Sequence, residues 1–196
     1  MIRRRPFRSL ARDNRGATII EFAIVAPVMC LLIMGICDLA YQIYAQSILN
    51  GALQKAGRDS TIQGAPNNTA AIDAKVSNMV KKVAANATFT FTRRNYDNFS
   101  MIKPEPFTDT NGNGVRNTGE CFTDMNGNGT WDSDPGVTGQ GGANDVTVYT
   151  VSVSYPHLFP VSVFGWPSTQ TITASTLLKN QPYASQSVVT PKQVCT

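Results

Sequence analysis

The longest apolar run in the chain covers residues 17–37 and contains one charged side chain, Glu21. At a rise of about 1.5 Å per helical residue, a run of this length can cross a bilayer core about 30 Å thick. Six arginines precede the run, and no Lys or Arg follows it until Lys55. Because basic residues flanking a span stay in the cytoplasm, the pattern predicts a single-pass membrane protein with a cytoplasmic N-terminus and an exported C-terminal part.

The apolar pattern continues beyond the predicted span with helical spacing. Ala40, Tyr44, Ile48, Ala52 and Ala56 recur every four residues, with a second such row beside them, so we expect one helix over residues 17–60. Its outer half either supports a globular head while the membrane half packs against other subunits or is simply a core helix of the exported domain. After a loop at 63–69, an apolar stripe predicts a second, short helix over about 69–85.

Alternating patterns predict the strands. Residues 87–92, 146–155 and 169–178 each alternate with a period of two, whereas 161–164 is either a short strand or part of a connection. The predicted fold is α+β: a long N-terminal helix packed on a small antiparallel sheet of three or four strands, with a short second helix. We divide the chain into a basic leader at 1–16, the helix at 17–60, and a head at 61–196 that carries an insertion at 104–142.

The insertion contains a repeat. Residues 107–114 (FTDTNGNG) recur at 122–129 (FTDMNGNG), and each copy has the pattern Asp-x-Asn-x-Asn-Gly. This matches the first half of an EF-hand-type calcium loop, in which alternate side chains supply oxygens and the glycine at position 6 permits a sharp turn. The first copy has a full set of expected ligands: Asp109, Asn111, Asn113, the Val115 carbonyl, Asn117 through water, and Glu120 at position 12.

The second copy lacks the closing glutamate, since position 12 is Pro135. Asp134 is the residue nearest to that position and is the expected replacement. The other expected ligands of this copy are Asp124, Asn126, Asn128, the Thr130 carbonyl and Asp132. Calcium here would order a segment that has few apolar residues. The alternative is a pair of metal-free Asn-Gly hairpin turns.

The distribution of charges and of the four cysteines adds to the predicted topology. Residues 1–16 hold six of the 17 basic residues and one of the 13 acids, so their removal would change the formal charge from +4 to −1. The basic character therefore reflects topology, and we expect no nucleic-acid partner. Cys30 and Cys37 lie in the apolar run and are expected to pack as small apolar residues. Cys121 and Cys195 lie in the exported part, where disulfides persist, and we predict that they pair.

Glu21 has two explanations on physical grounds alone. A carboxylate within an apolar span is a functional candidate by default, yet this one could also reach back to the headgroups. Gly16 followed by an apolar run from Ala17, with Glu21 as its fifth residue, resembles a class III prepilin signal. The stretch 15–28 (RGATIIEFAIVAPV) also resembles the opening of TadE-like pseudopilins of tight-adherence pili, and 171–183 resembles the closing strand and turn of that family.

This resemblance implies cleavage between Gly16 and Ala17 by a prepilin peptidase. Glu21 could then neutralise the new α-amino group of a neighbouring subunit, since opposite charges attract more strongly in a low dielectric. The expected function is a minor pseudopilin that partners with other pilin subunits. The alternative is a membrane-anchored calcium-dependent adhesion or scaffold module. We expect neither a small-molecule substrate nor an enzyme, because the single histidine, His157, has no catalytic set around it in the sequence.

Overall fold

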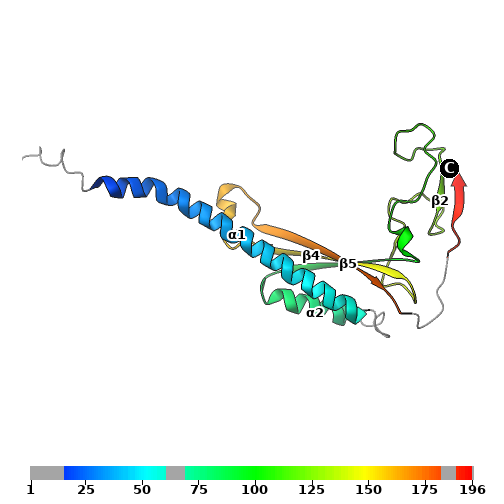
Figure 1. The fold of residues 1–196 in the computed structure, drawn as a ribbon, viewed down its shortest axis with the longest axis horizontal. Helices are drawn as coiled ribbons and strands as arrows, with labels where there is room; N and C mark the ends of the chain where they lie inside the picture. Colours follow the sequence, from blue (N-terminus) through cyan, green and yellow to red (C-terminus); the bar gives the residue numbers. More distant parts are fainter. Residues whose placement is uncertain (1–15, 61–68, 182–188, 196) are drawn as a thin grey trace, which may run out of the picture.

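A single long helix determines the outline of the structure, a computed structural model that describes residues 16–60, 69–181 and 189–195. This helix, α1, covers Ala17–Ser60 without interruption and is about 65 Å long at 1.5 Å per residue. Its N-terminal half extends away from the rest of the chain, and its C-terminal half packs against a head (Figure 1). The continuous helix predicted from the two apolar patterns is therefore present.

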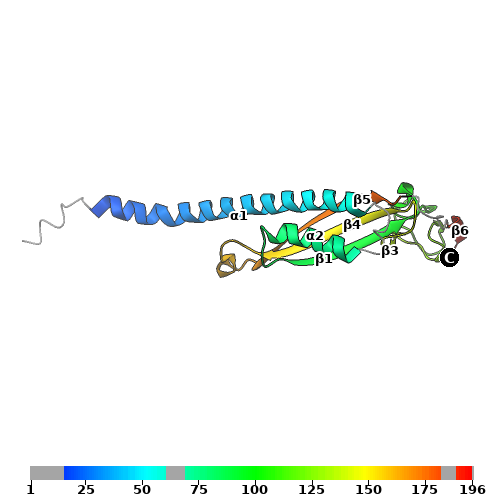
Figure 2. The ribbon, with the colours of Figure 1, turned by 90° about the horizontal axis from the view of Figure 1, so that it is seen from below.

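The head packs two helices on one antiparallel sheet. The second helix, α2, covers Thr69–Lys81 and lies beside the C-terminal half of α1 (Figure 2). The spacing of four seen in the sequence accounts for this packing, because it places one row and the end of the row beside it in the core. The first part of that latter row is not buried, since Tyr44 is 55% exposed. The α1 side chains with at most 3% exposure are Ala45, Leu49, Ala52, Leu53 and Ala56.

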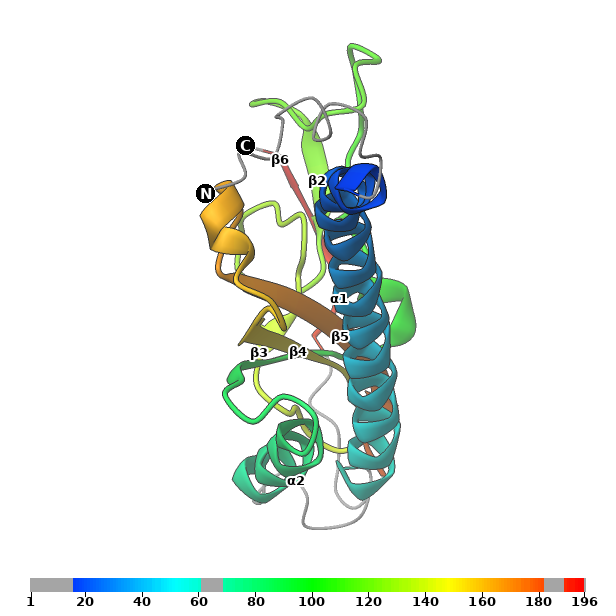
Figure 3. The same cartoon turned by 90° about the vertical axis from the view of Figure 1, so that its left-hand side faces the viewer.

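The sheet has four strands: β1 (Thr88–Tyr96), β3 (Val137–Thr138), β4 (Val146–Pro156) and β5 (Thr169–Lys179). Their spatial order is β3-β1-β4-β5, and all neighbours are antiparallel. β4 is central, and its alternation places Tyr149, Val151 and Val153 in the core with at most 1% exposure. Both helices lie on the same side of the sheet (Figure 3). The α+β fold class is confirmed.

A polar network joins α2 to the sheet. Arg93 on β1 forms an ion pair with Asp73 on α2, at 2.5 Å between Nη2 and Oδ1. Tyr149 on β4 donates its hydroxyl to the same Asp73 oxygen at 2.5 Å, and the guanidinium of Arg93 lies 4.3 Å from the centre of the Tyr149 ring. Burial and the Asp73 hydrogen bond both raise the pKa of Tyr149. The network therefore fixes α2 against two strands at once.

A second, smaller sheet lies at the end of the head remote from the free half of α1. It pairs β2 (Cys121–Asp124) with β6 (Lys192–Cys195) in an antiparallel arrangement. This sheet was not predicted, because neither strand is long enough to show alternation. Two 3₁₀ helices complete the fold: η4 (Phe99–Met101) and η5 (Val161–Phe164).

Element boundaries differ from the predictions in places where tertiary contacts decide them. α2 ends at Lys81 instead of residue 85, and the following turn buries Ala84. β1 runs on to Tyr96, past the predicted end at 92, because Arg93–Tyr96 continue the ladder with Val146–Tyr149. Residues 161–164 form η5 within the connection, so the strand alternative for them is wrong.

We expect Leu49→Ala to lower the free energy of unfolding by about 2–5 kcal/mol, because the Leu49 side chain on α1 is fully buried against α2 and the sheet. Thermal unfolding of the full chain in detergent micelles, followed by near-ultraviolet circular dichroism, measures this. The matched control is Gln54→Ala, an exposed position on the same helix, which should change stability by less than about 0.5 kcal/mol. Equal melting temperatures for the two variants would contradict the packing described above.

Candidate functional site

The N-terminal half of α1 is an apolar rod that the described chain leaves uncovered. From Thr18 to Cys37 every side chain is exposed except that of Ala26, which is half-buried. Ile19 and Phe22 are exposed by 71% and 69%. Among the described residues, α1 is the one helix long and apolar enough to cross a membrane. Because water would make such a surface costly, α1 is a candidate membrane anchor of a single-pass protein.

The predicted processing site lies at the start of this rod. α1 begins at Ala17, directly after Gly16, and the leader at 1–15 lies outside the described residues. Glu21 is exposed, one helical turn after Ala17. Its carboxylate therefore faces the surroundings of the rod and not the head.

The apolar rod ends at Asp38, whose carboxylate bonds the connection between β4 and β5 in the head. Asp38 Oδ2 lies 2.6 Å from Nδ1 of His157, and its Oδ1 accepts the backbone N–H of Leu158 at 3.1 Å. The side chains of Asp38 and His157 are only 16% and 15% exposed. His157 therefore ties the connection between β4 and β5 to α1.

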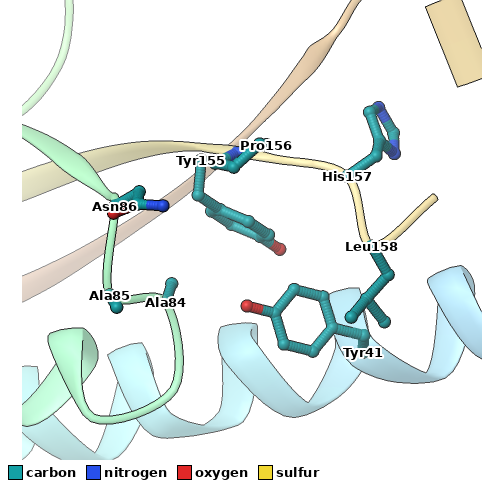
Figure 4. Close-up of a pocket in the computed structure, with 8 residues that line it drawn as sticks. All are labelled: Tyr41, Ala84, Ala85, Asn86, Tyr155, Pro156, His157 and Leu158. Atoms are coloured by element: carbon teal, nitrogen blue, oxygen red, sulfur yellow. The ribbon is translucent and has the colours of Figure 1, made fainter. Parts of the chain in front are cut away.

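A small pocket of about 220 Å³ lies beside this tie, between α1, the turn after α2 and the end of β4 (Figure 4). Tyr41 and Tyr155 meet edge to face in it, with ring centres 5.6 Å apart, and the Tyr41 hydroxyl donates to the Val83 carbonyl. Burial raises the pKa of Tyr155 to about 12. The lining supplies two phenols and an imidazole already engaged by Asp38, so we assign the pocket no reaction.

The first predicted calcium loop is wound around the Asp109 carboxylate. Gly112 and Gly114 donate their backbone N–H groups to its two oxygens, each at 2.7 Å. Both glycines have positive φ, 72° and 74°, which L side chains rarely adopt. Asn111 and Asn113 each accept the N–H two residues further on. All three side chains predicted as ligands at positions 1, 3 and 5 therefore accept hydrogen bonds from the backbone of the loop itself.

The second loop repeats this geometry around Asp124. Its two oxygens accept the N–H groups of Gly127 at 2.7 Å and Gly129 at 2.8 Å, and both glycines have a φ of 78°. The side chains of Asn126 and Asn128 accept local N–H groups as their counterparts do in the first loop. The side-chain amide nitrogens of both asparagines donate to Oδ2 of Asp132, which is position 9 of this loop. The Asp132 carboxylate is therefore bonded to the loop as well.

Each loop is closed by a glutamate, and for the second loop this residue is Glu105. In the first loop, Glu120 accepts the N–H of Thr110 at position 2 (2.9 Å) and that of Asn117 at position 9 (2.8 Å). In the second loop, Glu105 accepts the N–H of Met125 at position 2 (2.7 Å) and that of Asp132 at position 9 (2.9 Å). The two carboxylates therefore occupy equivalent places.

Glu105 was not among the predicted ligands, because it lies two residues before the repeat at 107–114. Read two residues further back, both copies begin Glu-x-Phe-Thr-Asp, at Glu105 and at Glu120. The two copies face each other in an antiparallel arrangement with a bridge between Phe107 and Phe122. Thr108 N–H bonds the Cys121 carbonyl and Thr123 N–H bonds the Pro106 carbonyl, both at 2.8 Å. This pairing brings the first glutamate of the repeat to the second loop.

Asp134, the replacement expected from the sequence, lies elsewhere. It accepts the Tyr96 hydroxyl at 2.7 Å and forms an ion pair with Arg94 at 2.9 Å. These contacts hold the end of the insertion against β1. In the structure Asp134 therefore bonds β1, and Glu105 is the acid that bonds the backbone of the second loop.

Three carboxylates of the loops are buried. Glu105, Glu120 and Asp124 are only 1%, 5% and 4% exposed. None of them takes part in an ion pair between described residues. Within the described ranges, no three His, Cys, Asp or Glu side chains gather as a metal-binding group. The remaining oxygens of each loop are amide and carbonyl oxygens, which calcium also accepts.

The disulfide lies next to these loops. Cys121, at the start of β2, is bonded to Cys195 of β6, and the two residues are direct partners across the small sheet. Their sequence separation is 74 residues. The bond therefore holds the C-terminal strand against the strand that leads into the second loop. Cys30 and Cys37 are free and exposed on the apolar rod.

Comparison with known proteins gives a family match in the N-terminal part of the chain. Residues 16–58, which correspond to α1, match the family described as TadE-like protein. The resemblance stated from the sequence is confirmed over this segment. No curated protein and no solved structure matches the chain. The family match and the exposed apolar helix together indicate a membrane-anchored, pilus-associated component.

We expect the first loop to lose order in acid, even without metal. The N–H groups of Gly114, Gly112 and Asn113 lower the pKa of Asp109 from its ordinary value of 3.8. Those of Asn117 and Thr110 lower the pKa of Glu120 from 4.5. Because both values are lower in the folded loop, its stability is present above the ordinary values and is lost as the pH falls through the lowered ones.

The amide signals of Gly112 and Gly114 in nuclear magnetic resonance spectra, recorded with a chelator present, measure this. They should stay constant down to about pH 4 and shift below it. In Asp109→Asn the two signals should already resemble the acid form at neutral pH. A shift centred at or above the ordinary carboxyl values would contradict the hydrogen bonding described.

Proposed function

We propose that this chain, TadE-like over residues 16–58, is a minor pseudopilin that is anchored in the inner membrane and acts in the assembly of a tight-adherence pilus. The observation that carries the proposal is the division of α1 into two halves. One half is packed into the head, and the other is an exposed apolar rod that begins directly after Gly16. Such a rod can lie in lipid first and then pack against the rods of other subunits without changing its fold.

The charge pattern supports the orientation and the processing step. Six arginines before Ala17 keep the N-terminus in the cytoplasm, so the head is exported to the periplasm or, within a pilus, to the cell exterior. A prepilin peptidase would cut between Gly16 and Ala17 and leave a positive α-amino group at the start of the rod. Glu21, one turn away, exposes the opposite charge. Attraction between Glu21 of one subunit and the amine of its neighbour would set the register of packing.

We further propose that the insertion binds two structural calcium ions. Buried carboxylates that form no ion pair with another described residue are costly, and a bound divalent ion would offset that cost. Glu120 would close the first site, and Glu105 would close the second. The other ligands would be Asp109, Asn111, Asn113, the Val115 carbonyl and Asn117 in the first site, and Asp124, Asn126, Asn128, the Thr130 carbonyl and Asp132 in the second.

A second candidate function follows from where the insertion lies. The loops and the small sheet occupy the end of the molecule opposite the N-terminus of α1 (Figure 1). A chain anchored by α1 would therefore present them farthest from the membrane. This placement suits a calcium-dependent adhesion or scaffold module that stays tethered and does not enter a filament.

N-terminal sequencing of the protein purified from its native membrane tests the processing step, and Ala17 should be the first residue. Glu21→Ala should give a stable, cleaved protein that is absent from purified pili, because the partner charge of the neighbouring amine is lost. Glu21→Gln keeps the shape without the charge and should fail in the same way. Thr18→Ala, exposed on the same turn, is the matched control and should assemble normally.

Two results would contradict this proposal. A mature protein that still begins before Gly16, in cells with an active peptidase, would leave the tethered module as the better explanation. Normal assembly of the Glu21→Ala variant would remove the assigned role of that carboxylate while leaving cleavage intact.

Isothermal titration of the full chain with calcium should give two ions per chain. Glu105→Gln and Glu120→Gln should each lower the number by one, because each removes one closing carboxylate. Calcium at about 100 times its dissociation constant should stabilise the wild type by about 2.7 kcal/mol per site, and a chelator should reverse the effect.

Asp134→Asn is the matched control, since Asp134 contacts Tyr96 and Arg94 and not the second loop. It should retain both ions. If Asp134→Asn loses an ion while Glu105→Gln keeps two, the assignment of the closing residue is wrong. If the wild type shows neither binding heat nor a melting shift, the loops are metal-free turns.

A further inference from the structure

The connection between β4 and β5, residues 157–168, is an apolar segment at the outer end of the proposed membrane span. From Leu158 to Ser168 it contains no charged side chain. Val163, Trp166 and Leu158 are exposed by 79%, 67% and 51%. Exposed apolar side chains that are grouped in one segment are typical of a contact with another protein or with a membrane.

The position of this connection along α1 is set by Asp38. His157 and the backbone of Leu158 both bond the Asp38 carboxylate, as described above. The apolar run from Ala17 to Cys37 spans about 31 Å as a helix, which equals the thickness of a bilayer core. Asp38, the first charged residue after Glu21, therefore marks the outer boundary of the core, and residues 157–168 are held at that level.

The arrangement of the elements also places η5 level with the boundary between the two halves of α1. η5 lies at the end of the head that faces the free half of α1 (Figure 1). In the perpendicular view it again occupies this end, opposite the insertion (Figure 2). The segment therefore lies level with the point along α1 where the uncovered apolar surface begins.

The connection is also preformed. His157 N–H donates to the Ser168 carbonyl, which closes its base, and Gly165 N–H donates to the Ser162 carbonyl at 3.0 Å. Gly165 ends η5 with a φ of 81°, a conformation that favours glycine. Pro160 and Pro167 restrict the backbone on either side. Inserting these side chains into lipid would therefore require little further ordering.

We propose that residues 157–168 lie in the interfacial region of the outer leaflet, with Leu158, Val163 and Trp166 inserted among the phospholipids beside α1. The segment would give the head a second contact with the membrane and fix its tilt relative to α1. Phospholipid is the partner that fits, because the segment continues the apolar surface of α1 at the depth where tryptophan prefers to lie. This inference rests on the proposed insertion of α1.

Tryptophan quenching by lipid tests the proposal in the full chain. The protein is reconstituted in vesicles of phosphatidylcholine and phosphatidylglycerol, with or without lipids brominated near the headgroup end of the acyl chains. The chain has two tryptophans, and Trp131 lies in the insertion far from the membrane. The difference between wild type and Trp166→Phe therefore isolates Trp166, whose emission should fall about twofold with brominated lipid. The emission of Trp131 that remains in Trp166→Phe should not change.

A charge placed in the segment is the second variant. Val163→Asp should abolish most of the Trp166 quenching, because a carboxylate keeps the loop out of the interface, whereas Val163→Ala should retain it. Both substitutions are at a highly exposed site, so the fold should be retained. Unquenched emission of Trp166 in the wild type would overturn the proposal. Emission that is shielded from water only at high protein density, and is insensitive to brominated lipid, would assign the surface to a second copy instead.

A dye on Cys30, in a Cys37→Ala background, separates failure of this inference from failure of the anchor. If the dye is quenched by brominated lipid and Trp166 is not, α1 spans the membrane and only the second contact is wrong. If neither is quenched, the proposed membrane insertion itself fails.

Discussion

The structure depends on one helix that meets two different surroundings along its length. In its C-terminal half the helical repeat places Ala45, Leu49 and Leu53 against α2 and the sheet, where none is more than 2% exposed. In its N-terminal half almost every side chain is apolar and exposed, so the apolar residues cover all faces of the helix and show no repeat. Since a helix satisfies its own backbone hydrogen bonds in water and in lipid alike, the same element can continue through both regions without a break.

This division explains how the head is placed. The last apolar turn of the rod is followed by Asp38, which is stable where water or a partner is available and costly in hydrocarbon. His157 and the Leu158 backbone occupy both of its oxygens. The boundary between the two halves of α1 is therefore also the point where the sheet is attached through the end of β4, and the position of the head follows from the position of the helix.

The sequence alone predicts those helices and strands whose apolar residues recur with a regular period. The spacing of four in α1 and the alternation in β1, β4 and β5 follow directly from burial on one face, and the structure has these elements with boundaries shifted by a few residues. The short strands β2 and β6 could not be predicted in this way, because four residues carry little pattern. They exist through their pairing with each other and the disulfide between them.

In the candidate site, too, the local contacts could be predicted from the sequence and the distant contact could not. Loop positions 1 to 6 depend on neighbouring residues, and both copies adopt the geometry that their Asp, Asn and Gly pattern predicts. The closing carboxylate of the second loop is different, because it comes from Glu105, 19 residues before Asp124, and not from Asp134. Linear spacing points to the nearest acid, but the antiparallel pairing of the two copies selects the acid that is equivalent by symmetry to Glu120. A repeat whose members face each other should therefore be searched for ligands on both sides of each copy, since the contact that completes one loop can come from the beginning of the other.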